Sequence, residues 1–247
     1  MSILQRAIFR SIQELRKATR NLVLIFVPVK KIPADETPIY IYHGNLYEHE
    51  DQYKISAFYG LALKRDNPRD LLLGCDGKIP ISNDIVDAVQ SQDVLEHLEP
   101  ASVITTLNEI YRILKPKGFF RLSVPDYRSP LLLKRTIFNY KGEALGDAGM
   151  GARAFTTDLN SELQIKHTAR AGNNHLWLPT HEKISEFLAN SKFANSEIKF
   201  LHYIKSDGSY RTADIPNMEV FKVKRVPPHD NRAGGLPISI VVDIVKY

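Results

Sequence analysis

Short continuous apolar runs alternate along the chain with amphipathic segments, and this pattern predicts buried strands separated by helices. In the two clearest helices, apolar residues recur every three or four positions, over Glu99–Leu114 and His181–Ala189. Pro116, Lys117 and Gly118 end the first of them. Strands are predicted at Leu22–Val27, Pro38–Tyr42, within Ala57–Leu63, and at Ile85–Ser91, Phe119–Val124, Ser196–Ile204 and Ile238–Lys246. We therefore expect an α/β fold with a seven-stranded mixed sheet and helices on both faces.

Residues 1–20 are predicted to be a separate amphipathic unit ahead of a domain over residues 21–247. Residues 1–31 contain seven of the 33 Lys and Arg but a single acid, Glu14. Three roles stay open for the helix over residues 3–20: packing on the domain or in a dimer, contact with an anionic membrane surface, and a targeting presequence. The remaining body is nearly neutral, so we expect no nucleic-acid partner.

Two long segments interrupt the regular pattern. Residues 128–175 are weakly periodic and rich in glycine and polar residues, and we interpret them as an insertion or lid. Residues 205–237 form a long connection with four prolines. Long connections in compact domains are usually functional or mobile.

Composition excludes several protein classes. The 247 residues are 43% hydrophobic and 25% charged, which is typical of a globular domain. A single cysteine, Cys75, excludes an intrachain disulfide framework and a cysteine-rich metal site. The longest apolar run, Leu22–Val29, is far shorter than the roughly 20 residues of a membrane-spanning helix. We expect the protein in the cytoplasm.

The most specific pattern lies between Asp84 and Asp126. This segment contains, in order, Asp87-Ala88-Val89, Val94-Leu95-Glu96-His97-Leu98, Leu114-Lys115-Pro116-Lys117-Gly118 and Val124-Pro125-Asp126. The series resembles the central part of class I S-adenosylmethionine (SAM)-dependent methyltransferases, and within them the broad methyltransferase type 11 group. Lys117 replaces the commoner glycine. The resemblance implies a Rossmann-like fold.

The same resemblance implies SAM as the cofactor and a small-molecule or glycan acceptor, with a hydroxyl of a sugar or glycan precursor as the expected target. In open α/β sheets, ligands bind beyond the carboxyl ends of the parallel strands. The residues expected on the cofactor side are Asp70, Gln92, Asp93 and Val94. Either His97 or His175 would be the base that takes the acceptor's proton.

One family feature is missing from its expected place. The predicted first strand ends in Phe26-Val27-Pro28, without the glycine-rich loop that lets the backbone approach the cofactor. Leu71–Gly77 looks like such a loop, but it lies too close to the predicted fourth strand to belong to the first. We interpret it as the connection between the third and fourth strands.

A metal site is a further alternative. Asp93, Glu96 and His97 share one face if their turn is helical, and two carboxylates with an imidazole can bind Mg²⁺. Some superfamily members, including small-RNA 2′-O-methyltransferases, are known for an E-x-x-E-H site with one further ligand. Candidates for that ligand here are His167, His175 and His181. The alternative, in which Glu96 caps the next helix and His97 packs locally, is adopted, and no metal is assigned.

Two functions compete with methyl transfer. Loss of the glycine-rich loop favours a degenerate methyltransferase-like protein that acts as a binding or scaffold module. The basic helix over residues 3–20 favours a peripheral membrane adaptor.

Overall fold

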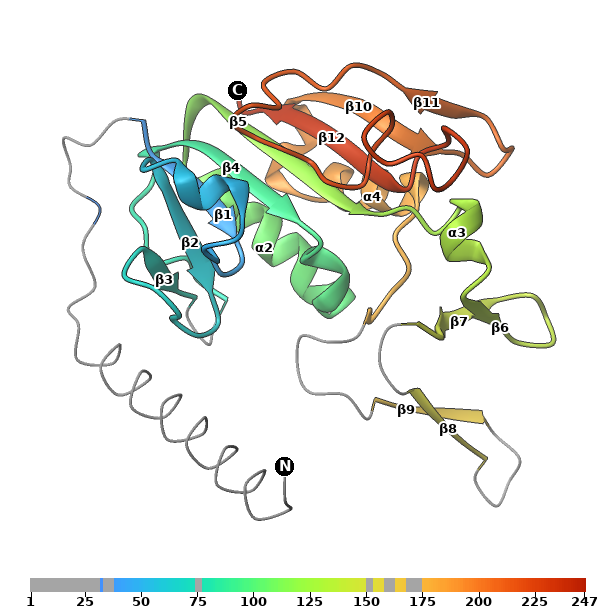
Figure 1. Cartoon of the computed structure of the whole chain (residues 1–247). Helices are drawn as coiled ribbons and strands as arrows, with labels where there is room; N and C mark the ends of the chain where they lie inside the picture. Colours follow the sequence, from blue (N-terminus) through green and yellow to red (C-terminus); the bar gives the residue numbers. More distant parts are fainter. Residues whose placement is uncertain (1–31, 33–37, 74–76, 150–152, 158–162, 168–174) are drawn as a thin grey trace, which may run out of the picture.

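An eight-stranded mixed sheet forms the centre of the protein (Figure 1). The computed structural model describes residue 32 and residues 38–73, 77–149, 153–157, 163–167 and 175–247. The strand order is β11-β10-β12-β5-β4-β1-β2-β3. The strands are β1 (Tyr40–His43), β2 (Phe58–Ala62), β3 (Asp70–Leu72), β4 (Val86–Gln92), β5 (Leu114–Pro125), β10 (Glu197–Ile204), β11 (Tyr210–Thr212) and β12 (Ser239–Val245). The predicted fold class is confirmed, with one strand more than expected.

The five strands from β3 to β5 run parallel, and β12, β10 and β11 are antiparallel to their neighbours. After β1 the chain adds β2 and β3 on one side and then returns to place β4 on the other. Such a switch point opens a crevice at the carboxyl ends of the strands. The segment predicted as the second strand, Pro38–Tyr42, thus contributes the central strand. The predicted strand Leu22–Val27 and the predicted helix before it lie outside the described residues.

Two short strands of the large sheet were not predicted from the pattern. The strand β3 begins the Leu71–Gly77 segment and lies at the sheet edge, which confirms that this segment does not follow the central strand. At the opposite edge, β11 consists of three exposed residues, so burial leaves no periodic signal in its sequence. The strand β5 also begins at Leu114 rather than at Phe119. Leu114 already pairs with Val86 of β4, and an irregularity that includes Lys117, at a φ of 64°, separates this pair from the regular pairing that starts at Phe119.

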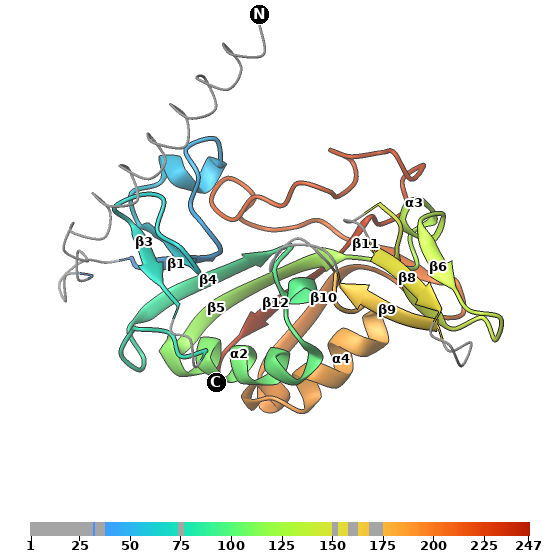
Figure 2. The same cartoon turned by 90° about the horizontal axis from the view of Figure 1, so that it is seen from below.

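Helices cover one face of the sheet (Figure 2). They are α2 (Pro100–Ile113), α4 (His181–Ala189) and the 3-10 turn η3 (Lys192–Asn195). The apolar stripe of α2, which includes Val103, Leu107 and Ile110, is fully buried against the sheet. Phe193 of η3 stacks on Phe120 of β5, with ring centroids 5.5 Å apart. This face forms the larger hydrophobic core.

The other face differs from the expectation of helices on both sides. Within the described residues, its cover is the 3-10 turn η1 (Asp51–Lys54) and the irregular segment 213–237. Arg121 of β5 is fully buried under this segment and donates to the carbonyl groups of Phe221 and Pro216. It also forms a two-bond ion pair with Asp243, with both N···O distances 2.7 Å. The buried hydrogen bonds and ion pair of Arg121 thus hold the cover of this face in place, where the other face has packed helices.

The elements between residues 128 and 175 take no part in the large sheet. They are α3 (Pro130–Leu133), the hairpin of β6 (Thr136–Phe138) and β7 (Ala144–Asp147), and the pair β8 (Arg153–Thr157) and β9 (Leu163–His167). The role of this region as a lid stays a prediction. No helix within the described residues is both long and apolar enough to cross a bilayer.

Candidate active site

The carboxyl ends of β1, β4 and β5 lie at one edge of the sheet, since the three strands are parallel neighbours. Gly44 follows β1, Asp93 follows β4, and Asp126 follows β5. The 3-10 turn η2 (Leu95–His97) continues from Asp93. This edge therefore brings together the two segments that the sequence predicts to carry the chemistry.

Residues 175–177 dock directly onto η2. The backbone N–H of Leu176 donates to the carbonyl of Glu96 at 2.7 Å. The indole Nε1–H of Trp177 donates to the carbonyl of Leu95 at 3.0 Å. These two hydrogen bonds, from the two residues that directly follow His175, thus hold this histidine beside the turn that carries His97.

The docking creates a compact group of ionisable side chains, Glu96, His97 and His175. Their ligand atoms all lie within 4.8 Å of one another, and the two imidazole rings meet edge to face with centroids 4.8 Å apart. Glu96 and His175 are buried, and His97 is half-buried. Burial, followed by the nearby charge of Asp93, raises the pKa of Glu96 well above its usual value. Neither carboxylate oxygen of Glu96 has a hydrogen-bond donor among the described residues.

His175 is held from its other side by Tyr127. The phenol oxygen lies 2.5 Å from Nδ1 of His175 and donates its own proton to Oδ2 of Asp147 at 2.6 Å. Arg135 donates to the same carboxylate. Although burial opposes it, the hydrogen bonds from Tyr127 and Arg135 lower the pKa of Asp147. Burial lowers the pKa of His175 to about 4, so its imidazole is neutral at pH 7.

Asp93 pairs with a cation from another part of the chain. It adopts a φ of 56° and pairs with Arg225 from segment 213–237. Next to it in the sequence, Lys224 pairs with Glu50 from the connection between β1 and β2. Two consecutive cations of the irregular segment therefore neutralise acids at the ends of β1 and β4.

The turn after β1 contains the glycine that the sequence seemed to lack. Gly44 has a φ of 126°, a conformation that side-chain-bearing residues rarely adopt. A Cβ at Gly44 would contact Val94 at 3.8 Å, which places the turn against the end of β4. There, Oε1 of Gln92 is buried without a donor among the described residues. The predicted residues Gln92, Asp93 and Val94 thus share one wall with Gly44.

The fourth residue predicted on the cofactor side, Asp70, is fully buried, and its carboxylate is hydrogen-bonded within the protein. Its carboxylate accepts hydrogen bonds from the backbone N–H groups of Leu46, Asp66 and Asn67 and from the side chain of Asn45. These bonds organise the connections on either side of β2. A contact between Asp70 and the cofactor stays a prediction.

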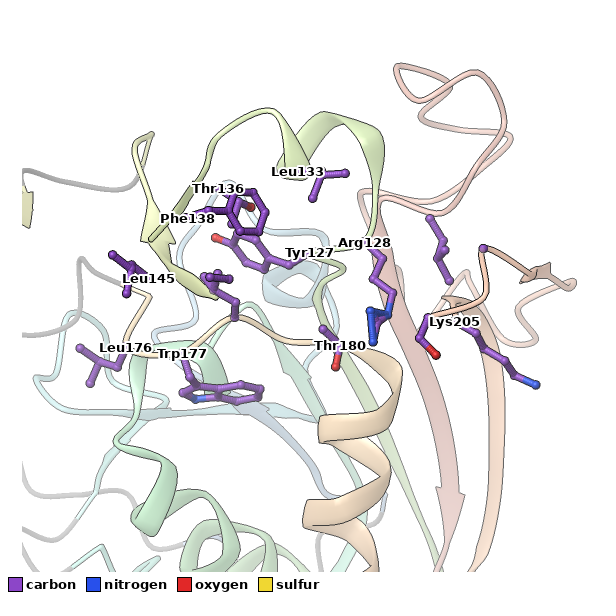
Figure 3. Close-up of a pocket in the computed structure, with 15 residues that line it drawn as sticks. Tyr127, Arg128, Leu133, Thr136, Phe138, Leu145, Leu176, Trp177, Thr180 and Lys205 are labelled. Atoms are coloured by element: carbon purple, nitrogen blue, oxygen red, sulfur yellow. The ribbon is translucent and has the colours of Figure 1, made fainter. Parts of the chain in front are cut away.

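A cleft of about 680 Å³ opens beyond the end of β5, and Tyr127 lines it. Trp177, Leu145 and Leu176 form one side, whereas Arg128, Thr180 and Lys205 lie on the other (Figure 3). Arg128 is paired with Glu182 at 2.7 Å. The cleft and the histidine group share Tyr127 and the 175–177 segment as their common wall.

Sequence reasoning missed Arg225, Asp147 and Arg135 as members of this region. Each belongs to a segment without periodicity, and each reaches the site through a contact that is distant in the sequence. It also assigned Asp93 to the candidate metal ligands together with Glu96 and His97, whereas the cluster in the structure replaces Asp93 with His175. Of the other ligand candidates, His181 contacts Phe200 and Tyr203, outside the cluster.

Comparison with known proteins adds a domain match. Residues 58–122 match the family described as "Methyltransferase domain". No curated protein shows a significant match to the chain. A SAM-dependent methyltransferase from Mesorhizobium loti is 12% identical, with a TM-score of 0.45 over 84% of this chain and 90% of that one. For another from Archaeoglobus fulgidus the identity is 14% and the TM-score 0.44, over 94% of both chains.

The Burkholderia thailandensis 1,6-didemethyltoxoflavin-N1-methyltransferase is 13% identical, with a TM-score of 0.41 over 85% of this chain and 71% of that one. The match over residues 58–122 spans β2, β4, η2 and α2, and so includes the turn that carries Glu96 and His97. The strand order around β1 agrees with the topology that the sequence resemblance implied.

The residues at the ends of β1 and β4 fit SAM, the cofactor of this family. Gly44 keeps the turn free of a side chain, and Gln92 offers a buried acceptor that lacks a donor. No carboxylate follows β2 directly, since Ala62 is followed by Leu63 and Lys64. Residues 58–122 thus match a methyltransferase domain, and the strand order of the sheet is the Rossmann-like one that the sequence resemblance implied.

Proposed function

We propose that this chain transfers a methyl group from SAM to a small polar acceptor, with a hydroxyl group of a sugar or glycan precursor as the target. The observation that carries the proposal is the shared wall between the histidine group and the cleft of about 680 Å³ beyond β5. An acceptor in this cleft would contact Tyr127, whose phenol oxygen is hydrogen-bonded to His175.

SAM supplies an electrophilic methyl group, so the chain has to hold the acceptor, exclude water and remove the acceptor's proton. Gln92, Asp93 and Val94 would hold the cofactor, with Gly44 leaving space for it. Trp177 and Tyr127 offer apolar and polar surface to a sugar-like acceptor.

We assign removal of the acceptor's proton to the pair His97 and His175. The neutral imidazole of His175 has a lone pair available at pH 7, and its orientation is fixed by Tyr127. His97 is the more exposed of the two and is therefore better placed to meet an acceptor directly. The two rings meet edge to face, so His175 also packs against the ring that would take the proton.

A second function, a binding or scaffold module without catalysis, is favoured by one observation. The pair of Asp93 with Arg225 already neutralises the acid expected to face the cofactor.

Titration calorimetry of the full chain with SAM and with S-adenosylhomocysteine distinguishes the two functions. Saturable binding of both ligands at micromolar concentration, weakened about tenfold by Gln92→Ala or Asp93→Ala, supports the methyltransferase. Asp207→Ala, which removes an exposed acid on the β10–β11 turn, is the matched control and leaves binding unchanged. Absence of heat with millimolar ligand overturns the enzymatic function and leaves the binding module.

A further inference from the structure

We propose that Glu96, His97 and His175 form a site for one divalent transition-metal ion of the Zn²⁺ class, beside the acceptor cleft. Its ligands lie on η2 and on His175, whereas the residues proposed to hold SAM lie at the ends of β1 and β4, so metal binding can be tested without SAM. The metal site extends the proposed function. Its role in catalysis rests on that function, whereas metal binding itself does not.

The first argument is the state of Glu96. Its side chain is fully buried, and both carboxylate oxygens lack a hydrogen-bond donor among the described residues. An ionised carboxylate in this position is costly unless a cation or donors meet it. Nε2 of His175 lies 3.8 Å from Oε1, too far for a hydrogen bond but close enough for both atoms to bind one ion.

The second argument is the tautomer of His175. Tyr127 donates its phenolic proton to Asp147, which Arg135 and the N–H of Gly149 keep in the charged form. The phenol oxygen must therefore accept a hydrogen bond from the Nδ1–H of His175. This leaves Nε2 with a lone pair that faces Glu96. Metal-binding histidines are held in the same way, with the second ring nitrogen donating to an oxygen.

The third argument selects the metal. Two imidazoles and one carboxylate favour zinc and its neighbours, whereas Mg²⁺ and Ca²⁺ favour oxygen ligands. Three protein ligands leave coordination positions for water or for an acceptor oxygen. The ligand set differs from the one considered for Mg²⁺ in the sequence, because Asp93 is paired with Arg225 and His175 takes its place.

With the ion bound, the two imidazoles act on the acceptor through the metal rather than as free bases. A divalent ion would lower the pKa of a coordinated acceptor hydroxyl, so that this hydroxyl would lose its proton to water in the cleft.

The test uses the full chain without an affinity tag, freed of metal with a chelator and titrated with Zn²⁺ by calorimetry in the absence of SAM. We expect one Zn²⁺ per chain, bound at micromolar concentration or more tightly, together with a higher Tm. Co²⁺ gives a second readout, since its visible absorption reports the ligand geometry. Glu96→Gln and His97→Asn each weaken Zn²⁺ binding by more than about 100-fold, and Tyr127→Phe weakens it by about tenfold through the orientation of His175.

Two controls accompany these variants. His229→Asn removes an exposed histidine in segment 213–237 and leaves the affinity unchanged. Asp93→Asn weakens binding by less than about tenfold, because this carboxylate acts only through its charge. Circular dichroism checks the fold of every variant, and Glu96→Gln keeps the shape of the side chain.

Three results overturn the proposal. They are the absence of Zn²⁺ binding by the wild-type chain, equal binding by wild type and Glu96→Gln, and a loss with Asp93→Asn as large as the loss with Glu96→Gln. The result is separate from the proposed methyl transfer, because the failure of SAM to bind leaves the Zn²⁺ titration unaffected.

Discussion

The indole of Trp177 donates its Nε1–H to the backbone carbonyl of Leu95, and this bond fixes residues 175–177 against the turn at the end of β4. The ring is buried and meets Phe187 of α4 edge to face, with centroids 5.1 Å apart. One side chain thus connects the sheet edge, the helix layer and the wall of the cleft. It is also the single tryptophan of the chain, so its fluorescence reports on the site itself.

We expect Trp177→Phe to lower the free energy of unfolding by about 2 kcal/mol, because the variant loses the hydrogen bond and leaves a small cavity. Urea unfolding followed by circular dichroism measures the change. Tyr140→Phe, at a position that is 93% exposed, is the control and stays within about 0.5 kcal/mol of the wild type. Equal stability of both variants would show that the Leu95 bond contributes nothing.

Arg121→Met should destabilise the fold by about 3–5 kcal/mol, since it leaves Asp243 and two carbonyl groups without their buried partner. The double variant Arg121→Met, Asp243→Leu should regain part of this loss. Lys183→Met removes one partner of an exposed pair with Glu186 and should cost less than about 1 kcal/mol. Denaturant midpoints of the three variants provide the comparison.

Acid should destabilise the protein partly through His43. Burial lowers the pKa of His43 from 6.5 to about 4. Between these values the unfolded chain binds the proton and the folded chain does not, so stability falls as the pH drops from about 6.5 to about 4. His43→Asn should therefore lose about 2 kcal/mol less than the wild type between pH 7 and pH 4.5. Urea unfolding at both pH values tests the difference, and an identical loss in both proteins contradicts it.

Gly60→Ala should destabilise the edge of the sheet by about 3 kcal/mol. The new Cβ would lie 2.2 Å from Oδ1 of Asp70 and 3.0 Å from the backbone nitrogen of Leu46. Asp70 would have to move and would lose its hydrogen bond to Leu46. Thermal unfolding measures the effect, and an unchanged Tm would be inconsistent with this close approach.

Arg225→Ala should tighten SAM binding about two- to fivefold. The substitution frees the carboxylate of Asp93 from a partly exposed ion pair, which contributes on the order of 1 kcal/mol at most. The freed carboxylate then attracts the positively charged sulfonium. Calorimetry at low and high salt measures the change, and weaker binding would instead identify Arg225 as a contact of the cofactor.

The sequence predicted most of the helices and strands whose buried residues recur at regular positions along the chain. The apolar stripe of α2 and the continuous runs of β4, β5 and β12 are confirmed, because their residues face a core on regular positions. The cover of the second face was not predictable, since Phe221 and Val223 occur in a segment without any period.

The candidate site was predictable in its parts but not in its arrangement. The motif around His97 indicated the turn after β4, and His175 was singled out as a polar residue next to Trp177. Their contact depends on the return of the chain after the 128–175 region, which no local pattern encodes. The same holds for Arg225, whose pairing with Asp93 joins residues far apart in the chain.

The strand β12 lies hydrogen-bonded between β5 and β10, both of which precede it in the sequence. During synthesis on the ribosome, the emerging chain therefore holds a gap at the middle of its sheet until residues 239–245 leave the exit tunnel. Segment 213–237, which covers the second face of the sheet, also comes late in the sequence. Its Lys224 is hydrogen-bonded to Glu50, and the carbonyl of its Lys222 accepts a hydrogen bond from Gln52. The large sheet is consequently complete only after residues 239–245 are available, so the pairing of β12 is a late step in the assembly of this fold.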